Sequence, residues 1–492
     1  MASSRVADRF SILLIILGVL VSDTVSDLEE AAYPTDIGDV AFIILSQPES
    51  FHILRAQKIK SSLEEQAKKL KWAAPSVTLL HEQWPGKTGA WTVQPLLTDL
   101  AEKFSKFRWL FFCEDQTSIN LAKLLEVLKR FDPSKEQFLG KALRDSIPTI
   151  IHHFAFHDNP SSFAYPDFAA GFLLSQPLIK SLAERWLEKK SKMDFTIDPK
   201  HELAKFIWDD DRGPRLTDIP ELCAGEPDEK CATNCEVRLP DCGAPVPKEK
   251  IFFAIKTCEQ YHTERVPVVQ KTWGQDAMNI EYYSEKEDSS IPTIDLGVPN
   301  TVRGHCGKFL AILKRVHSKE NLSKIPWLVV ADDDTLLSVS RLQRLLACYN
   351  PEEKVALGER YGYGTSSGLG YDYITGGGGM VLSQKTVSVL LDTKTAYCPS
   401  DESPDDMLLG TWLKRLDIPI IHSPLFHQAR PDDYAGDYLG HQEEPISFHK
   451  HWMVDPYKVY NQWLKEKDIA KENEPEKPRK PKIIIEDVHD EL

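Results

Sequence analysis

Two stretches of the chain place a continuous apolar run directly before acidic residues, and each run predicts a buried strand. The later stretch, Trp327 to Thr335, has the sequence WLVVADDDT, and the earlier one, Trp109 to Thr117, has the sequence WLFFCEDQT. An apolar run without polar alternation is typical of a strand that is covered on both faces in a parallel sheet. Residues that follow such a strand lie at its carboxyl end, which is the edge where open α/β sheets bind ligands.

The two stretches belong to a longer internal repeat of four blocks in the same order. Each strand is followed by apolar residues at helical spacing, over 121–128 and 339–346, and then by a proline. Further on, residues 168–176 (FAAGFLLSQ) match residues 376–384 (GGGGMVLSQ). Upstream, residues 40–63 resemble residues 251–273, each a strand that leads into a helix. Alternating strands and helices predict an α/β fold with two Rossmann-like domains, at 37–222 and 250–464.

The two copies differ at the positions that carry charge. Gln116 stands in the first copy where Asp334 stands in the second, and bulkier residues replace the glycines Gly376 to Gly379. We therefore predict that the first copy is degenerate and keeps the fold without the chemistry. A second active site of different specificity is the alternative.

Length and charge limit the class of protein. A chain of 492 residues is too long for one ordinary core and favours two or three domains. The hydrophobic content of 42% is ordinary for a globular protein. The net charge of −15 argues against a nucleic-acid partner, which needs a basic surface.

Both ends of the chain carry targeting signals. Arg5 and Arg9 precede the apolar run from Phe10 to Val21, which predicts a secretory signal peptide over 1–26 and no stable membrane anchor. A type II anchor is the alternative, although the run is short for a membrane span. Residues 465–488 form a charged tail that presents the final residues 489–492, HDEL, an address that the retrieval receptor of the endoplasmic reticulum (ER) binds. We expect a soluble protein of the ER lumen, and the sequon at Asn321 agrees with that compartment.

Nine cysteines in an oxidising compartment predict disulfides. The cysteines at 223, 231, 235 and 242 crowd residues 223–249, which we interpret as a disulfide-linked linker between the domains. A zinc site there is the alternative, but the spacings match no common zinc pattern. The odd total leaves at least one thiol unpaired, and Cys113, inside an apolar strand, is our candidate.

The candidate chemistry lies in the second copy and begins with Asp332, Asp333 and Asp334. Three adjacent carboxylates repel one another, and a hard divalent cation accepts oxygen ligands of this kind while keeping positions open for substrate phosphates. We therefore predict a metal and diphosphate site. A solvated acidic turn is the alternative.

Other residues of the second copy lie near the same predicted edge. Thr257 follows the apolar strand 251–255, and Arg265 and Lys308 on the next helices offer cations for a phosphate or a base. Four consecutive glycines, Gly376 to Gly379, indicate that a ligand or another backbone approaches closely, and we interpret them as one wall of a sugar pocket.

Two further groups complete the candidate site. Asp405 and Asp406 follow a proline at the start of a predicted helix, where the helix dipole stabilises carboxylates. Asp406 is our candidate for a general base, with Asp405 as the second choice. His427 follows the predicted strand 418–421 and is our candidate for a further metal ligand.

The second half resembles the fringe-like β1,3-glycosyltransferases. The resemblance rests on WLVVADDDT, the glycine run, PDDM followed by GTWLKRL, and PLFHQ, in this order, and it covers about 251–463. Including the degenerate first copy, the PLFHQARPDDY and ISFHKHW segments and the HDEL ending, the whole chain is similar to the members that extend O-linked fucose with glucose. The resemblance implies tandem GT-A folds, UDP-glucose as the donor and Mn²⁺ or another divalent cation. It also implies proteins with O-fucosylated thrombospondin type 1 repeats as acceptors.

The resemblance also implies roles for single residues. Asp334 would bind the metal directly, Asp332 and Asp333 would support the metal and the donor ribose, and His427 would complete the metal shell. Asp406 would be the base of a single inverting displacement. Rival interpretations are a fringe-type transferase of N-acetylglucosamine or galactose, and a non-catalytic ER lectin or folding factor.

Overall fold

The computed structural model describes residues 33–188, 195–225, 228–235, 239–365, 370–442 and 444–465. The predicted signal peptide, the charged tail beyond residue 465 and the HDEL ending lie outside these residues. No helix in the described ranges is both long enough and apolar enough to cross a membrane.

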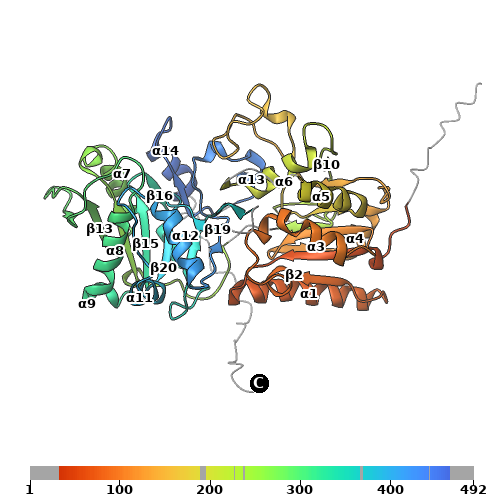
Figure 1. The fold of residues 1–492 in the computed structure, drawn as a ribbon, viewed down its shortest axis with the longest axis horizontal. Helices are drawn as coiled ribbons and strands as arrows, with labels where there is room; N and C mark the ends of the chain where they lie inside the picture. Colours follow the sequence, from red (N-terminus) through yellow and green to blue (C-terminus); the bar gives the residue numbers. More distant parts are fainter. Residues whose placement is uncertain are drawn as a thin grey trace, which may run out of the picture.

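Two mixed sheets lie side by side, one in each half of the chain (Figure 1). The strands of the first sheet are, in spatial order, β10 (Thr217–Asp218), β5 (Phe138–Gly140), β8 (Phe172–Ser175), β3 (Trp109–Glu114), β1 (Val40–Leu45) and β2 (Ser76–Leu79). The second sheet is given from the opposite edge, so that its matching strands appear in the reverse order. Its strands are, in spatial order, β14 (Thr293–Asp295), β13 (Asn279–Ser284), β12 (Ile251–Lys256), β15 (Trp327–Asp332), β20 (Met380–Ser383), β17 (Ala356–Gly358) and β21 (Ile421–His422).

Apart from the edge strand β14, which has no counterpart in the first sheet, the two sheets share their strand order and strand directions. Strand β3 pairs in parallel with β1 and antiparallel with β8, just as β15 pairs in parallel with β12 and antiparallel with β20. The register agrees as well, because Val40 lies opposite Trp109 and Ile251 lies opposite Trp327. The repeat found in the sequence is therefore a repeat of the fold, while its assignment to the GT-A class stays a prediction.

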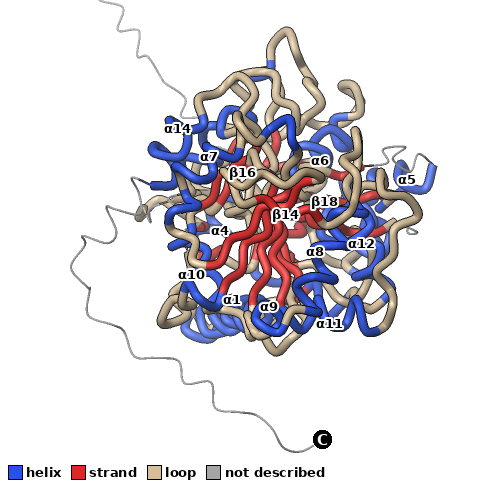
Figure 2. Tube along the Cα trace, turned by 90° about the vertical axis from the view of Figure 1, so that its left-hand side faces the viewer, coloured by secondary structure: helices blue, strands red, loops and turns tan. Residues whose placement is uncertain are grey.

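Helices cover the strands on both sides (Figure 2). Those of the first half are α1 (Ser50–Lys69), α2 (Leu80–Gln83), α3 (Leu97–Lys103), α4 (Leu121–Leu128), α5 (Gln176–Glu188) and α6 (Pro199–Trp208). Those of the second half are α7 (Val266–Lys271), α8 (Cys306–Ser318), α9 (Glu320–Ser323), α10 (Val339–Leu346), α11 (Gln384–Asp392), α12 (Asp405–Arg415), α13 (Gly436–Gly440) and α14 (Pro456–Val459). Helices α4 and α10 have the bounds that the apolar spacing predicts. The sequon residue Asn321 is exposed on α9.

Short ladders flank each sheet and correct the predicted end of the first copy. Strand β4 (Thr117–Ile119) pairs with β11 (Thr233–Cys235), and β16 (Thr335–Leu337) pairs with β22 (Ser447–His449) in the same antiparallel way. The first copy therefore does not end at Leu222, because a strand of the predicted linker 223–249 completes it. The predicted strand over 418–421 was also too early: β21 begins at Ile421, since Pro419 has no N–H group for a ladder.

Three disulfides connect the described cysteines. The pairs are Cys223–Cys231, Cys242–Cys348 and Cys306–Cys398. Disulfides do occur in the predicted linker: Cys223–Cys231 lies within it, and Cys242 is bonded to Cys348 of the second half, whereas Cys235 is unpaired. Cys113 is unpaired and buried, as predicted, and so are Cys235 and Cys258.

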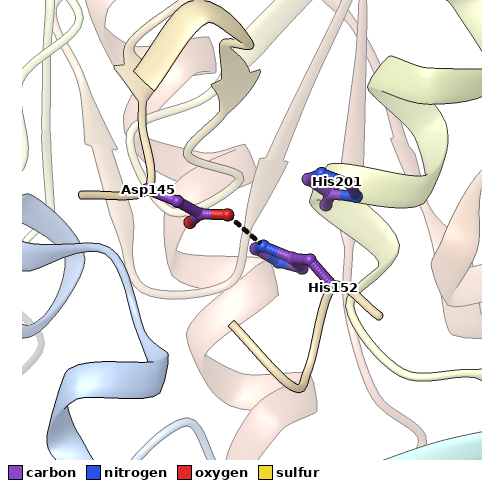
Figure 3. Close-up of side chains that lie close together, drawn as sticks. All are labelled: Asp145, His152 and His201. Carbon is purple, nitrogen blue, oxygen red and sulfur yellow. Dashed lines mark hydrogen bonds and ion pairs between the residues drawn. The ribbon is translucent and has the colours of Figure 1, made fainter. Parts of the chain in front are cut away.

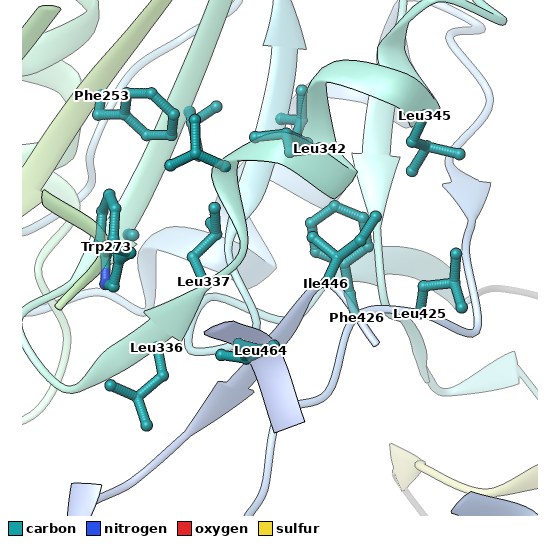
Figure 4. Close-up of a cluster of buried hydrophobic side chains, with 14 of the residues drawn as sticks. Phe253, Trp273, Leu336, Leu337, Leu342, Leu345, Leu425, Phe426, Ile446 and Leu464 are labelled. Carbon is teal, nitrogen blue, oxygen red and sulfur yellow. The ribbon is translucent and has the colours of Figure 1, made fainter. Parts of the chain in front are cut away.

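A buried apolar cluster holds the end of β15 in place (Figure 4). Leu336 and Leu337, which follow the three aspartates, are 2% and 0% exposed and belong to the same cluster as Phe253, Trp273 and Ile446. Burying one such leucine contributes about 1.5–3 kcal/mol. Buried apolar residues therefore precede and follow the three aspartates in the sequence, and their packing fixes the short segment between them.

The two halves are in direct contact. Strand β9 (Phe195–Thr196) of the first half pairs with β18 (Arg360–Tyr363), which in turn pairs with β19 (Tyr371–Ile374). The Trp91 indole N–H donates to Asp372 at 3.0 Å. A remaining short ladder, β6 (Ala142–Leu143) with β7 (Tyr165–Pro166), lies within the first half.

Candidate active site

Strands β12 and β15 bring Lys256 and Asp332 together at the carboxyl edge of the second sheet. The two residues are partners in the parallel register, and Lys256 Nζ lies 2.9 Å from Asp332 Oδ1. The same ammonium contacts Asp405 Oδ2 at the start of α12. Burial disfavours the charged lysine, but the two carboxylates outweigh burial and raise the pKa of Lys256. One buried cation thus links the aspartate cluster to the acidic pair of α12.

Asp333 is held by groups of the chain itself. Thr257 Oγ1 donates to Asp333 Oδ2 at 2.7 Å, and Arg265 Nη1 lies 3.2 Å from Asp333 Oδ1. Burial raises the pKa of Asp333 to about 6. The guanidinium of Arg265 also lies over the Tyr261 ring, 3.7 Å from its centroid. The predicted donor-binding residues Thr257 and Arg265 therefore meet at Asp333.

Asp334 lies between a guanidinium and an imidazole. Arg265 Nη1 is 2.9 Å from Asp334 Oδ2, and His449 Nε2 is 3.0 Å from Asp334 Oδ1. His449 Nδ1 is 2.9 Å from the carbonyl oxygen of Gln428, so we assign the Nδ1 proton to that bond. Burial opposes ionisation of Asp334, but the hydrogen bond and charge of His449, with the charge of Arg265, hold its pKa below the usual range.

Asp332, Asp334 and His449 form a group that could hold a metal ion. Their candidate ligand atoms all lie within 4.8 Å of one another. Two carboxylate oxygens and an imidazole nitrogen suit a divalent ion such as Mn²⁺. With a metal ion bound, His449 would keep its Nδ1 proton on the Gln428 carbonyl oxygen and give the lone pair of Nε2 to the ion, as a histidine ligand requires.

The prediction that His427 completes this group was wrong. His427 is 1% exposed, its Nδ1 is 2.9 Å from the carbonyl oxygen of Ser447, and its ring stacks on Phe448. Burial lowers the pKa of His427 to about 4. His449 takes the place because β22 carries it back across from Thr335, the residue after the aspartates. The ISFHKHW segment contains this histidine, but its pairing with β16 is not visible in the sequence.

The acidic pair of α12 divides into two environments. Asp405 contacts Lys256, which keeps the pKa of Asp405 low although the residue is buried. Asp406 accepts from its neighbour Met407 N at 2.7 Å and from Gly376 N at 3.4 Å. Burial, joined by the negative charge of Asp405, raises the pKa of Asp406 to about 6. Asp406 is therefore ionised at neutral pH and yet more basic than an ordinary aspartate, as a general base should be.

The glycine run lies against both groups. A Cβ at Gly377 would come within 2.3 Å of His449 Nδ1, and one at Gly376 would lie 3.8 Å from Asp406 Cβ. Gly379 has a φ of +95°, in the region that favours glycine. Only a glycine fits this close to the imidazole at position 377, whereas Gly376 leaves room for a Cβ beside Asp406. The part of these glycines in a sugar pocket stays a prediction.

Lys308 lies behind Thr257. Its ammonium donates to the Thr257 carbonyl oxygen and lies 3.5 Å from Glu285 Oε2. The residue is 4% exposed, and burial lowers the pKa of Lys308. Lys308 thus supports the segment that carries Thr257, whereas a direct donor contact by Lys308 stays a prediction.

Comparison with known proteins adds family evidence to this geometry. The profile of the family described as Fringe-like matches residues 41–200 and 246–471. The chain belongs to the Fringe-like family. Most of each copy of the repeat lies within the matched residues, so the first half also carries the family pattern.

Two relatives match the chain over nearly its whole length. The β1,3-glucosyltransferase of Mus musculus is 51% identical over 460 residues, which cover 92% of this chain and 93% of the relative. The β1,3-glucosyltransferase of Homo sapiens is 54% identical over 437 residues, 89% of this chain and 87% of the relative. Human lunatic fringe, a β1,3-N-acetylglucosaminyltransferase, is 24% identical and covers 37% of this chain and 54% of that protein. Together with the family, these matches support a β1,3-glycosyltransferase.

Proposed function

We propose that this chain transfers glucose from UDP-glucose, in β1,3 linkage, to O-linked fucose on thrombospondin type 1 repeats. The observation that carries the proposal is that Lys256 joins two groups of different chemistry at one sheet edge. On one side lies a metal-ligand group, Asp332, Asp334 and His449, and on the other lies Asp406, a carboxylate with a pKa of about 6. The names of the two near-full-length relatives support glucose as the sugar.

The bond-forming step in this proposal belongs to Asp406. Its carboxylate takes the proton of the fucose 3-hydroxyl while that oxygen attacks the anomeric carbon of the donor. The bond from the anomeric carbon to the diphosphate oxygen breaks in the same displacement, so the configuration inverts and no covalent enzyme intermediate forms. Burial of Asp406 beside Asp405 makes its carboxylate a stronger base without removing its charge at neutral pH.

The remaining residues bind and orient the donor. A divalent cation such as Mn²⁺, bound by Asp332, Asp334 and His449, would neutralise the charge that develops on the UDP leaving group. Arg265, which already contacts Asp333 and Asp334, places a guanidinium beside the same position. Asp333 and Thr257 supply the carboxylate and hydroxyl that we assign to the donor ribose.

We place the reaction in the ER lumen, on the basis of the N-terminal signal pattern and the HDEL ending. Proteins with O-fucosylated thrombospondin repeats would be the acceptors, and the retrieval receptor would return the enzyme. We assign recognition of the folded acceptor to the first copy, because it keeps the fold without the charged groups of the second. Its strand β9 pairs with β18 of the second half, so it also supports the catalytic half.

The deciding experiment is a transfer assay on an O-fucosylated thrombospondin repeat, with UDP-glucose, UDP-galactose and UDP-N-acetylglucosamine as donors. We expect transfer from UDP-glucose that needs Mn²⁺, is abolished by a chelator, and falls about 100- to 10,000-fold in Asp406→Asn. The matched control is Glu202→Gln on α6, the corresponding helix of the first copy, which should leave transfer unchanged. Selective transfer of another sugar would support a fringe-type transferase instead. Binding of the acceptor without transfer from any donor would indicate a lectin or folding factor.

A further inference from the structure

The first half contains a second cluster of potential metal ligands, far in sequence from the aspartate cluster. Asp145, His152 and His201 have candidate ligand atoms that all lie within 4.8 Å of one another, and the three residues are 5%, 4% and 4% exposed. Asp145 and His152 lie in the connection between β6 and β7, and His201 lies on the first turn of α6 (Figure 3). The cluster thus joins a long connection to a helix.

His152 is held on both ring nitrogens by carboxylates. Its Nδ1 is 2.6 Å from Asp145 Oδ2, and its Nε2 is 2.9 Å from Asp198 Oδ2. The other oxygen of Asp145 accepts from the Tyr165 hydroxyl at 2.8 Å. Histidine ligands of zinc characteristically donate their second ring N–H to a carboxylate, and ligating carboxylates are themselves hydrogen-bonded. Asp198 and Tyr165 supply both of these supporting contacts.

His201 lacks the hydrogen bonds that a buried imidazole normally makes. Neither ring nitrogen has a hydrogen bond to any residue that the structure describes, although only 4% of the residue is exposed. A metal–nitrogen bond would give this imidazole a partner.

We propose that Asp145, His152 and His201 bind a zinc ion in the first half of the chain. Two imidazole nitrogens and one carboxylate oxygen make a ligand set that zinc prefers, with a fourth position left for water. A cavity of about 260 Å³ lined by His152, His201, Asp198 and Glu202 gives the ion a path to the cluster.

Binding requires two local changes. The Nδ1 proton of His152 leaves and the hydrogen bond to Asp145 opens, so that Nδ1 and the Asp145 carboxylate both face the ion while Nε2–H stays bonded to Asp198. The two imidazole rings stack with centroids 3.9 Å apart and planes 10° from parallel. A zinc ion lies near the plane of each imidazole that binds it, so His201 also turns about its Cβ–Cγ bond. The bound ion fastens the connection between β6 and β7 to α6, the helix that follows β9 and its pairing with the second half. The proposal concerns folding of the first half and does not depend on the transfer reaction.

The test is zinc binding by the full chain in the Asp334→Asn background, which removes a ligand of the aspartate cluster. After chelator treatment, we expect one zinc per chain by calorimetry and elemental analysis, and a higher unfolding temperature with zinc. Cobalt in place of zinc should give the intense visible absorption of a four-coordinate site. His201→Phe keeps an aromatic ring against His152 and removes the ligand nitrogen, so zinc affinity should fall at least about 100-fold.

Two controls keep the test decisive. His449→Gln, in the second half, should leave the zinc stoichiometry and the cobalt spectrum unchanged. Circular dichroism should show that His201→Phe keeps the parent fold. A folded parent that binds no zinc, or a folded His201→Phe that binds zinc as the parent does, would overturn the proposal. In either case the cluster would be a protonated His152 held between two carboxylates, without a metal.

Discussion

At the edge of the second sheet, His449 lies 3.0 Å from Asp334, whereas the first sheet carries Cys235 and Gln116 at the matching positions. The match follows from the ladders, because Thr335 pairs with His449 and Thr117 pairs with Cys235. The same backbone framework therefore presents a carboxylate and an imidazole that could bind a metal in one half, and a neutral pair in the other.

Hydroxyl groups that hold the framework are kept in both halves. In the second half, Thr335 Oγ1 donates to the Gly377 carbonyl oxygen at 2.9 Å and Ser447 Oγ donates to the Gly378 carbonyl oxygen at 2.6 Å. In the first half, the corresponding donors and acceptors are Thr117 to Ala169 at 2.7 Å and Thr233 to Ala170 at 2.6 Å. The segments that lead into β8 and β20 are thus fixed by hydroxyl bonds, and none of these bonds uses a candidate metal ligand.

Each half has a buried lysine beside an aspartate, but the lysine lies on a strand in the second half and on a helix in the first. In the second half it is Lys256, on the central strand, and it contacts Asp332 and Asp405. In the first half the matching strand position is Leu45, and Lys200 on α6 lies 3.2 Å from Asp198. Aligned on the prolines that open the two helices, Lys200 and His201 correspond to Asp405 and Asp406. The first half therefore has no carboxylate at the position of the proposed base.

The largest effect should come from giving the second half the apolar residue of the first. Lys256→Leu leaves the buried Asp405 and the partly exposed Asp332 without their cation, and breaking a buried ion pair costs about 3–5 kcal/mol. Urea denaturation should show that loss in the free energy of unfolding, and transfer should be abolished. Leu45→Met is the matched control and should cost less than about 1.5 kcal/mol. Equal losses in the two variants would mean that Lys256 acts only through packing.

A smaller effect should come from exchanging the loop residues. In Gly377→Ala, the new Cβ meets the His449 imidazole at 2.3 Å, so the ring must move away from Asp334. We expect about a tenfold fall in kcat/KM at limiting Mn²⁺ and partial recovery at high Mn²⁺, because a disturbed metal ligand weakens metal binding. The reverse exchange in the first half, Ala169→Gly, should leave transfer unchanged. A loss in Gly377→Ala that no concentration of Mn²⁺ reduces would place the glycine in sugar binding instead.

The pH profile gives the smallest but most specific effect. The folded pKa of Asp406 lies near 6, above the ordinary value for aspartate, so the base form predominates only above about pH 6. We expect kcat at saturating donor to fall as the pH drops through about 6, approaching a tenfold loss per unit. Asp333 has a similar pKa, but its protonation should appear in the KM for the donor. Glu114 of the first half, whose pKa burial raises to about 7, should not contribute, and Glu114→Gln should keep the wild-type profile.

The sequence predicts the parts of this site that local patterns determine. The apolar runs predict β3 and β15, and the four matched blocks predict the repeat that the strand orders share. Asp332 to Asp334 are expected at the carboxyl edge because they follow a strand, and Asp405 and Asp406 at a helix start because they follow a proline. These inferences need only a few consecutive residues each.

The parts that the sequence did not predict depend on contacts between distant segments. His449 reaches Asp334 through the β16–β22 ladder, and nothing local separates it from His427, which also follows apolar residues. The same type of pairing assigns Cys235 to the first copy, although its cysteine-rich surroundings indicate a linker. Cys242 has its partner, Cys348, 106 residues away.

The most direct test of the central claim, that the second half alone carries the chemistry, is the stoichiometry of Mn²⁺-dependent UDP-glucose binding to the full chain by calorimetry. The account predicts one donor site per chain, lost in Asp334→Asn and His449→Gln and retained in Gln116→Leu and Cys235→Ala. Two donor sites in the wild type, or one site that survives Asp334→Asn and disappears in Gln116→Leu, would contradict it.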